Sequence, residues 1–211
     1  MTAVALLGGS GRLGGHVLER LLNAGCSVRA LCHRNALAIA DPGIELVHGD
    51  ARDPSTYATL LDGAELVVST LGNASAPVPD VCSGAIACLV TAMRERGLQR
   101  IVSTTGSAAR LDREIGHEHR WLASRRAALM RHMAPLILDA EAHMRMLTES
   151  PLSWTVVRAP IMLALSGAAG VLASSPAEPD ATLGYGAVAG LLVAELLAPR
   201  WIHAAPFAVP A

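Results

Sequence analysis

Three glycines near the start of the chain are spaced for contact with a phosphate group. Gly8, Gly11 and Gly14 follow an apolar run at residues 3–7, and a segment with apolar residues at helical spacing comes directly after them. The expected order is a strand, a glycine turn and the first turn of a helix. Free N–H groups and the helix dipole attract phosphate there, and glycine lets the backbone approach it closely. The segment therefore predicts a site for the pyrophosphate of a dinucleotide.

The end of the second predicted strand indicates which dinucleotide would bind. NAD-selective sites use a carboxylate at this point to hold the ribose 2′-hydroxyl group. No Asp or Glu occurs between Glu19 and Asp41. The strand expected at 27–32 instead ends at His33 and Arg34. Because a guanidinium group suits a 2′-phosphate, NADP(H) is favoured over NAD(H), with a solvated loop charge as the alternative for Arg34.

Two further arginines lie near this predicted site. Arg29 lies within the second predicted strand, where its guanidinium group also matches a 2′-phosphate. Arg12 lies inside the glycine turn, where it either reinforces the phosphate site or faces water.

Strands and helices are expected to alternate through the first two-thirds of the chain. The expected strands lie at residues 3–7, 27–32, 43–48, 65–71, 100–104 and 152–157, with a short strand or tail at 205–209. After the first amphipathic segment, helices are expected at 54–61, 81–96 and 184–197, and a charged helical stretch interrupted by Pro135 at 110–150. Residues 167–180 are rich in small side chains and predict a mobile loop.

This alternation predicts an α/β fold with a Rossmann-like, doubly wound parallel sheet, helices on both faces and a small C-terminal substrate lobe. We expect a single domain over residues 1–211, whose part from about 160 onward contributes the substrate side. Ligands of such sheets bind at the carboxyl ends of the strands. Glycine or polar residues follow the expected strands at 8–14, 33–34, 50, 71–72 and 104–107. A binding cleft is favoured there over ordinary polar loops.

Several motifs together identify a family resemblance. They are GGSGRLGG, VRALCHR, the Gly-Asp pair at 49–50, VVSTLG and LSWTVVRAP, within residues 3–161. This combination resembles the NAD(P)H-binding, NmrA-like branch of the atypical short-chain dehydrogenase/reductase group. That branch includes the small flavin reductase and biliverdin reductase B enzymes, which the short chain resembles most in length.

The resemblance implies roles for particular positions. At the pyrophosphate it implies Gly8, Ser10, Gly11, Arg12 and Leu13, with Gly14 of the same motif. Arg34 would bind the 2′-phosphate. Asp50 and Ala51 would lie at the adenine, and Leu71 and Gly72 beneath the adenosine ribose. On the nicotinamide side it implies Thr104, Thr105 and Ser107 beside the ribose, and Pro160 and Ile161 near the carboxamide.

One element of the larger family is absent. That family donates a proton from a tyrosine assisted by a lysine four residues later, but this chain has no lysine and only two tyrosines, Tyr57 and Tyr185. Alcohol oxidation by the Tyr-Lys route is therefore excluded. A conjugated acceptor such as a flavin or a tetrapyrrole can take hydride without a dedicated strong acid.

Three residues are candidates for a catalytic role. His143 lies on the helix that carries the missing pair in relatives, and histidine suits acid–base chemistry. An ordinary histidine on the helix surface is the favoured alternative. Thr105 and Ser107 are candidate hydrogen-bond donors to an acceptor oxygen, or alternatively loop caps.

A run of arginines is expected over the mouth of the site, at positions 110, 113, 120, 125, 126 and 131. Acidic residues intersperse it, so a solvated helix is favoured over an entry for an anionic substrate, such as a flavin phosphate or a propionate-bearing tetrapyrrole. His117 and His119 are two residues apart and face different directions on a helix, so we expect no metal site. Aromatic residues make up only 3% of the chain, so a stacking surface would depend on Trp121 or on the nicotinamide.

The composition limits the compartment and the partners. A hydrophobic content of 52% with 17% charged residues suffices for a large core, and a net charge of −1 favours neither nucleic acid nor a membrane surface. No apolar run reaches the ~18–20 residues of a membrane span. The four cysteines form no CxxC pair, so we expect a soluble protein of the reducing cytoplasm.

Two functions from different classes remain. The first is an NADPH-dependent oxidoreductase that transfers hydride to a planar small-molecule acceptor, anionic or neutral, of flavin, tetrapyrrole or quinone type. The second is a non-catalytic NADP(H)-binding protein that senses redox state, as NmrA-like members resemble. Epimerase-like chemistry on the same scaffold is a further alternative, since fold does not fix function. Either protein would be a monomer or a small homo-oligomer.

Overall fold

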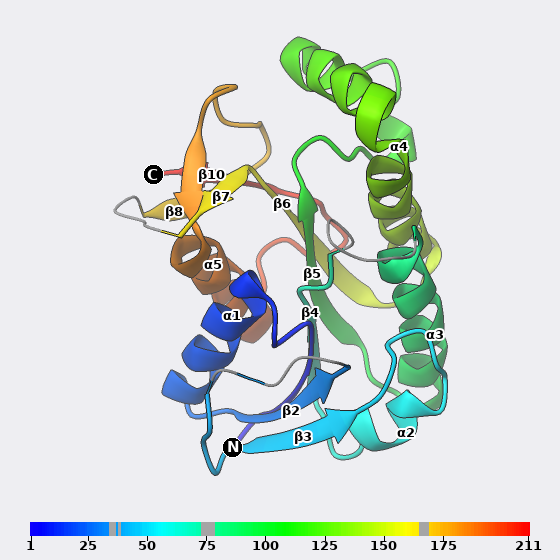
Figure 1. Ribbon diagram of the computed structural model, residues 1–211, viewed down its shortest axis with the longest axis vertical. Coiled ribbons are helices and arrows are strands. Elements are labelled where there is room, and N and C mark those ends of the chain that lie inside the picture. The colour runs from blue at the N-terminus through cyan, green and yellow to red at the C-terminus, as the bar shows by residue number, and fades with distance from the viewer. Residues whose placement is uncertain (34–36, 38, 73–78, 165–168) are drawn as a thin grey trace.

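The computed structural model describes residues 1–33, 37, 39–72, 79–164 and 169–211. Among these residues, eight strands form one sheet in the order β3-β2-β1-β4-β5-β6-β10-β8 (Figure 1). The strands are β1 Ala3–Leu7, β2 Ser27–Cys32, β3 Ile44–His48, β4 Leu66–Ser69, β5 Arg100–Gly106, β6 Ser153–Ala159, β8 Gly170–Ala173 and β10 Phe207–Pro210. All neighbours are parallel except β8 and β10, so the predicted Rossmann-like sheet is confirmed.

Helices cover both faces of the sheet (Figure 1). They are α1 Arg12–Asn23, α2 Thr56–Leu60, α3 Val81–Glu95, α4 Arg120–Glu149 and α5 Tyr185–Leu197. One core joins the sheet to α1 and α5 through side chains such as Val17 and Leu192, and the other joins it to α3 and α4 through Leu89 and Met144. This arrangement explains why strands such as β1 are apolar at nearly every position, since both of their faces are buried.

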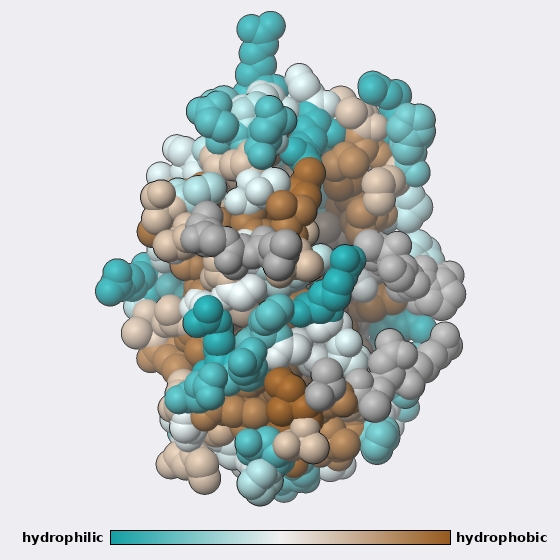
Figure 2. All heavy atoms as spheres, turned by 60° about the vertical axis from the view of Figure 1, so that its left-hand side comes forward, coloured by the Kyte–Doolittle hydropathy of each residue, from teal (hydrophilic) through white to brown (hydrophobic). Residues whose placement is uncertain are grey.

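None of the helices in the described ranges is both long and apolar enough to cross a membrane. On the face that Figure 2 turns forward, hydrophobic residues gather in separate patches between hydrophilic ones.

The C-terminal third adds strands that periodicity did not predict. β7 Ile161–Leu163 pairs in parallel with β9 Thr182–Gly184 in a separate two-stranded sheet. The loop predicted at 167–180 is wrong for residues 170–173, which form β8. The last strand, β10, pairs in parallel with β6 in the main sheet, and β8 pairs antiparallel with the other edge of β10. A strand near 205–209 is thus confirmed, shifted to Phe207–Pro210.

The prediction of a charged helical stretch over 110–150 is wrong at its start, whereas its predicted interruption at Pro135 is confirmed. Residues 112–114 form a short 3₁₀ turn, and α4 begins only at Arg120. Gly116 has φ of +81°, which lies outside the helical range, so a helix cannot continue through this residue. Within α4, Met133 has non-helical angles of −136° and 33°, two residues before Pro135. Proline removes an N–H donor and clashes with the preceding turn, so it explains the interruption.

The interruption is a sharp bend. Arg126 and Glu141 form two hydrogen bonds of 2.6 and 2.7 Å, although they are fifteen residues apart in the chain. In a straight helix fifteen residues span ~22 Å. The two halves of α4 therefore fold toward each other, and the first half reaches over the carboxyl end of the sheet.

Candidate functional site

The glycine turn brings the ends of β1 and β4 into close contact. Gly8 has φ of +83°, and a Cβ atom there would lie 2.8 Å from Thr70 Oγ1. The Thr70 hydroxyl donates to the carbonyl oxygens of Leu7 and Gly8, at 3.1 and 3.2 Å. A Cβ atom on Gly14 would lie 1.9 Å from the Gly8 carbonyl oxygen. Glycine is therefore required at both positions by the backbone alone.

The first turn of α1 has the features of an anion site. Gly11 is the residue that precedes the helix, and no side chain caps its N–H groups. The first turn also holds no acidic residue. The free N–H groups and the helix dipole of this turn favour a negative charge. Ser10 and Arg12 flank the turn, and the Arg12 guanidinium lies 5.3 Å from the ring centre of Tyr185 on α5.

The cations expected at the second strand have different positions. Arg34 lies outside the described residues, and His33 is exposed after β2. Arg29 bonds the Glu45 carboxylate at 2.8 Å and forms an ion pair of 3.2 Å with Asp62. The Arg29 guanidinium is thus already paired with two carboxylates, and the expectation that it meets a 2′-phosphate is wrong.

The predicted adenine side lies after β3 and β4. Asp50 Oδ1 accepts the Arg52 N–H at 2.9 Å, and this bond holds the pKa of Asp50 below its usual range. Ala51 is buried, and its carbonyl oxygen accepts the Tyr57 hydroxyl. Leu71 and Gly72 follow β4 at the same edge of the sheet, with Gly72 exposed. The fold thus gathers these residues with the glycine turn at the carboxyl edge.

The residues at the end of β5 differ in how free their hydroxyls are. Thr104 is buried and donates to the Val157 carbonyl at 2.9 Å. The hydroxyls of Thr105 and Ser107 bond none of the residues that the structure describes, and both residues are half-buried. The Ser107 N–H donates to the Ala159 carbonyl at 2.8 Å, which fixes the turn after β5 beside β6. Free hydroxyl donors therefore remain at this point.

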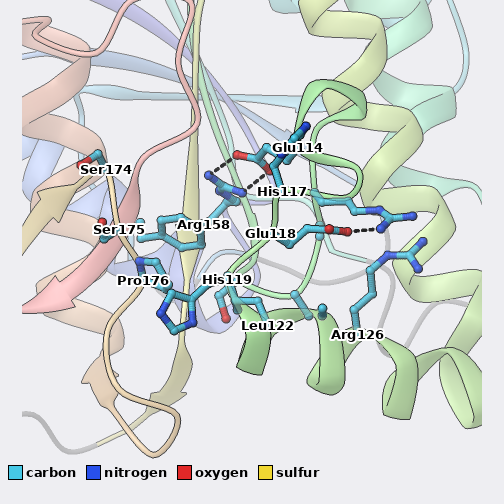
Figure 3. A pocket seen from close by; sticks show the side chains of 16 residues that line it. Glu114, His117, Glu118, His119, Leu122, Arg126, Arg158, Ser174, Ser175 and Pro176 are labelled. Carbon is cyan, nitrogen blue, oxygen red and sulfur yellow. Dashed lines mark hydrogen bonds and ion pairs between the residues drawn. The ribbon is translucent and has the colours of Figure 1, made fainter.

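A cavity of about 270 Å³ opens beside Ser107 (Figure 3). Its walls come from residues 107–110, from 114 and 117–119, from the first turns of α4 and from the loop 174–176 after β8. Phe207 of β10 and Arg158 of β6 also line it, with the Arg158 guanidinium 3.7 Å from the Phe207 ring centre. At about 270 Å³ the cavity is slightly smaller than the ~300–1,000 Å³ typical of small-molecule sites.

Carboxylates pair with the arginines that line this cavity. Arg158 donates two hydrogen bonds to Glu114, at 2.7 and 2.9 Å, and Arg126 donates two to Glu141. Arg110 pairs with Glu118, whose pKa is lowered by its own backbone N–H and by that arginine. The arginine run is therefore only partly the solvated surface that was favoured, because two of its members, Arg110 and Arg126, line the cavity and are paired with carboxylates.

A narrow recess adjoins the cavity. It shares Ser107, Pro176 and Phe207 with the cavity and adds Pro160 and Trp121. Ile161, predicted near the carboxamide together with Pro160, begins β7 and is exposed. Trp121 thus lies where the stacking surface was expected, next to two predicted site residues.

His143 lies elsewhere. It is only 3% exposed, and its Nε2 atom lies 2.8 Å from Ser103 Oγ. Burial lowers the pKa of His143 to about 4, so the ring is neutral at pH 7. The favoured expectation of a surface histidine is wrong, because this face of α4 packs on the sheet. His143 is also absent from the cavity wall, so the structure does not bring it together with Ser107.

Two histidines to which the sequence pattern assigns no role at the site line the cavity. They are His117 and His119, and both are exposed. Within the described part of the chain, no group of three or more His, Cys, Asp or Glu residues could hold a metal ion. Their place at the cavity depends on the irregular segment before α4, which the sequence pattern assigns to a helix.

Comparisons with known proteins agree with this geometry. The sequence model of the NAD(P)H-binding family matches residues 8–199. A search of curated proteins finds no match. A solved short-chain dehydrogenase/reductase from Veillonella parvula in complex with NADP is 14% identical, with a TM-score of 0.78 over 99% of this chain and 94% of that one.

Two further solved structures share the fold. The anaerobillin reductase ChuY from Escherichia coli O157:H7 is 21% identical, with a TM-score of 0.76 over 99% of this chain and 97% of its own. A candidate NADH-flavin reductase from Streptococcus pneumoniae is 17% identical, with a TM-score of 0.75 and complete coverage of both chains. The family model confirms the expected NAD(P)H-binding family, and the solved structures confirm the fold.

Proposed function

This chain belongs to the NAD(P)H-binding family, and from that premise we propose that it is an NADPH-dependent reductase for a planar acceptor. The observation that carries the proposal is the cavity of about 270 Å³ beside Ser107. It lies past the ends of β5 and β6, away from the glycine turn after β1. A protein that only bound a dinucleotide would not need space for a second ligand there.

The chain's own residues would hold the cofactor along the carboxyl edge of the sheet. The first turn of α1 would bind the pyrophosphate, Asp50 and Ala51 would flank the adenine, and Ser107 and Pro160 would flank the nicotinamide. Bound NADPH would supply a hydride. The protein's part is to place the acceptor against the nicotinamide and to exclude water from the narrow recess, which provides the orientation on which such transfers depend.

NADP(H) is the cofactor that we propose, because no carboxylate competes at the end of the second strand and Arg34 follows it. We expect Arg34→Ala to weaken NADPH binding by ~1.5–3 kcal/mol, the range for charge-assisted hydrogen bonds, and to leave NADH binding almost unchanged. Titration calorimetry with both cofactors measures this. Equal losses for NADPH and NADH would contradict the assignment.

The ion pairs in the cavity wall refine the class of acceptor. Arg110, Arg126 and Arg158 are each paired with a carboxylate, so the wall offers an anion little unpaired charge. Arg113 and Arg120 are exposed and form no ion pair with the described residues. We therefore expect the conjugated ring of a flavin, a tetrapyrrole or a quinone in the cavity, and any anionic group of the acceptor at the exposed arginines.

A small acceptor panel tests this function. Purified protein is incubated with NADPH and with FMN, riboflavin, biliverdin or a quinone, and NADPH oxidation is followed. We expect saturable oxidation above background with at least one acceptor. FMN and riboflavin form a matched pair, since they differ by a phosphate. A preference for FMN would support binding of the anionic group by the exposed arginines Arg113 and Arg120. Tight NADPH binding without turnover would favour the redox-sensing alternative instead.

A further inference from the structure

Reduction of an unsaturated acceptor needs a proton as well as a hydride, and few groups near the cavity could deliver one. Of the ionisable side chains in the cavity wall, Arg110, Arg126 and Arg158 are too basic to release protons readily, and Glu114 and Glu118 accept hydrogen bonds from arginines. His117 and His119 remain. Histidine as a residue type exchanges protons in the neutral range, which suits a general acid.

The two tyrosines of the chain and His143 lie away from the cavity. Tyr57 is fully buried, and its hydroxyl donates to the Ala51 and Ala85 carbonyls. Tyr185 lies under the Arg12 guanidinium at the start of α5. His143 is buried against Ser103. None of these three residues lines the cavity.

His119 lies at the junction of the cavity and the recess. It directly precedes α4, and its ring meets the Trp121 ring edge-on, with centres 6.2 Å apart. Trp121 lines the recess that contains Pro160 and Ser107, whereas His119 lines the cavity. Figure 3 shows the His119 ring beside Pro176, which belongs to both spaces. A ring bound beside Ser107 would therefore lie next to His119.

We propose that His119 is the proton donor to the reduced acceptor. The inference rests on the proposed reductase function and adds the residue that completes it. Hydride from NADPH forms a new C–H or N–H bond on the acceptor and leaves NADP⁺. The electron pair displaced within the acceptor takes the proton from the His119 imidazolium, which leaves neutral imidazole. Since His119 is exposed, water reprotonates it before the next turnover.

The charges around His119 come from every wall of the cavity and recess. They are Glu114 and Glu118 on the segment before α4, Arg110 after β5, Arg120, Arg125 and Arg126 on α4, Arg158 on β6, Glu178 on the loop after β8, and the second histidine, His117. Glu114 pairs with Arg158, Glu118 pairs with Arg110, and Arg126 pairs with Glu141. If His119 is the general acid, the alkaline limb of the pH–rate profile depends on it.

The test compares three variants, His119→Gln, His117→Gln and His132→Gln, at saturating NADPH with the acceptor that wild type reduces fastest. We expect His119→Gln to lower kcat about 100-fold, a typical contribution of a general acid, and to abolish the alkaline limb. Added imidazole should restore part of the rate. His132→Gln, on the exposed side of α4, is the control that keeps wild-type kinetics. Fluorescence titration should show unchanged NADPH binding in all three proteins.

A second readout does not depend on turnover. NMR titration of the wild-type imidazole signals should give for His119 the same midpoint as the alkaline limb. A wild-type rate that survives His119→Gln, or an alkaline limb that disappears in His117→Gln instead, would overturn the donor assignment and leave the reductase function intact. Absence of NADPH oxidation by wild type with every acceptor would overturn the reductase function and the donor with it.

Discussion

Two adjacent glycines in the first turns of α1 differ in what a side chain would meet. A Cβ atom on Gly14 would lie 1.9 Å from the Gly8 carbonyl oxygen, far inside contact distance. On Gly15 the nearest atom, the Gly9 carbonyl oxygen, would be 4.0 Å away. The backbone of the phosphate turn therefore packs directly on the helix at Gly14 and not at Gly15.

A pair of substitutions tests this packing. We expect Gly14→Ala to reduce the free energy of unfolding by ~1–3 kcal/mol, because the turn must move away from α1. It should also weaken NADPH binding, since the same turn carries the N–H groups. Gly15→Ala, the matched control, should raise stability by ~0.5–1 kcal/mol through the better helix propensity of alanine. Urea denaturation and NADPH titration measure both effects, and equal behaviour of the two variants would contradict the packing.

At the residue scale, sequence predicts best what local backbone geometry dictates. The spacing of Gly8, Gly11 and Gly14 indicates the phosphate turn because glycine is needed there whatever surrounds it. His143 and His119 show the opposite. The charged pattern of α4 does not reveal that His143 faces the sheet. The position of His119 depends on how the segment 111–119 folds back over β6, to which Glu114 is bonded through Arg158.

At the element scale, α4 is the part that shapes the cavity. Its first half supplies Leu122 and Arg126 to the cavity wall, while its second half is tied to the body through Asp139, which accepts the N–H groups of Cys82 and Ser83 at the start of α3. Glu141 joins the halves, since it accepts two hydrogen bonds from Arg126 and one from the Arg110 N–H. The geometry of the cavity therefore depends on this carboxylate.

Removal of the Glu141 charge tests this contact between the two halves of α4. We expect Glu141→Gln to lower the free energy of unfolding by about 2 kcal/mol, the scale of a hydrogen bond between charged groups in a partly buried site. Amide hydrogen exchange should increase over residues 120–132 more than over 134–149. Asp112→Asn, which breaks the exposed pair with Arg145, is the control and should change neither measurement appreciably. Unchanged exchange over 120–132 in Glu141→Gln would contradict the role of this contact.

Alternating strands and helices could be predicted because each has its own hydrophobic period. The bend in α4 was signalled by Pro135, but its depth was not, since the Arg126–Glu141 contact involves residues far apart in sequence. β8 was missed for the same kind of reason. Residues 170–173, Gly-Val-Leu-Ala, lie within a stretch rich in small residues, and they form a strand because the edge of β10 offers hydrogen-bond partners.

At the scale of the whole molecule, His143 links stability to pH. Burial lowers its pKa from 6.5 to about 4, so the unfolded chain takes up this proton first as the pH falls. The stability that depends on the neutral ring is complete above pH 6.5 and is lost progressively down to pH 4. Asp50 and Glu118, with pKa values below their usual range, contribute losses only at lower pH.

We expect the free energy of unfolding to fall by about 3 kcal/mol over this range, the equivalent of the His143 shift. His143→Gln, which keeps a hydrogen-bonding group near Ser103, should flatten that part of the profile. His132→Gln should retain the wild-type slope, because His132 is exposed. Urea denaturation at a series of pH values measures all three proteins. A slope in His143→Gln as steep as in wild type would contradict the assignment.

Hydride transfer from NADPH to a second ligand beside Ser107 is tested most directly by a single-turnover experiment. The protein–NADPH complex is mixed rapidly with the best acceptor, once with ordinary NADPH and once with NADPH deuterated at the transferred position. We predict an acceptor-dependent loss of the reduced nicotinamide absorbance that is slower with deuterium. A stable complex whose nicotinamide stays reduced in the presence of every acceptor would contradict the proposed function.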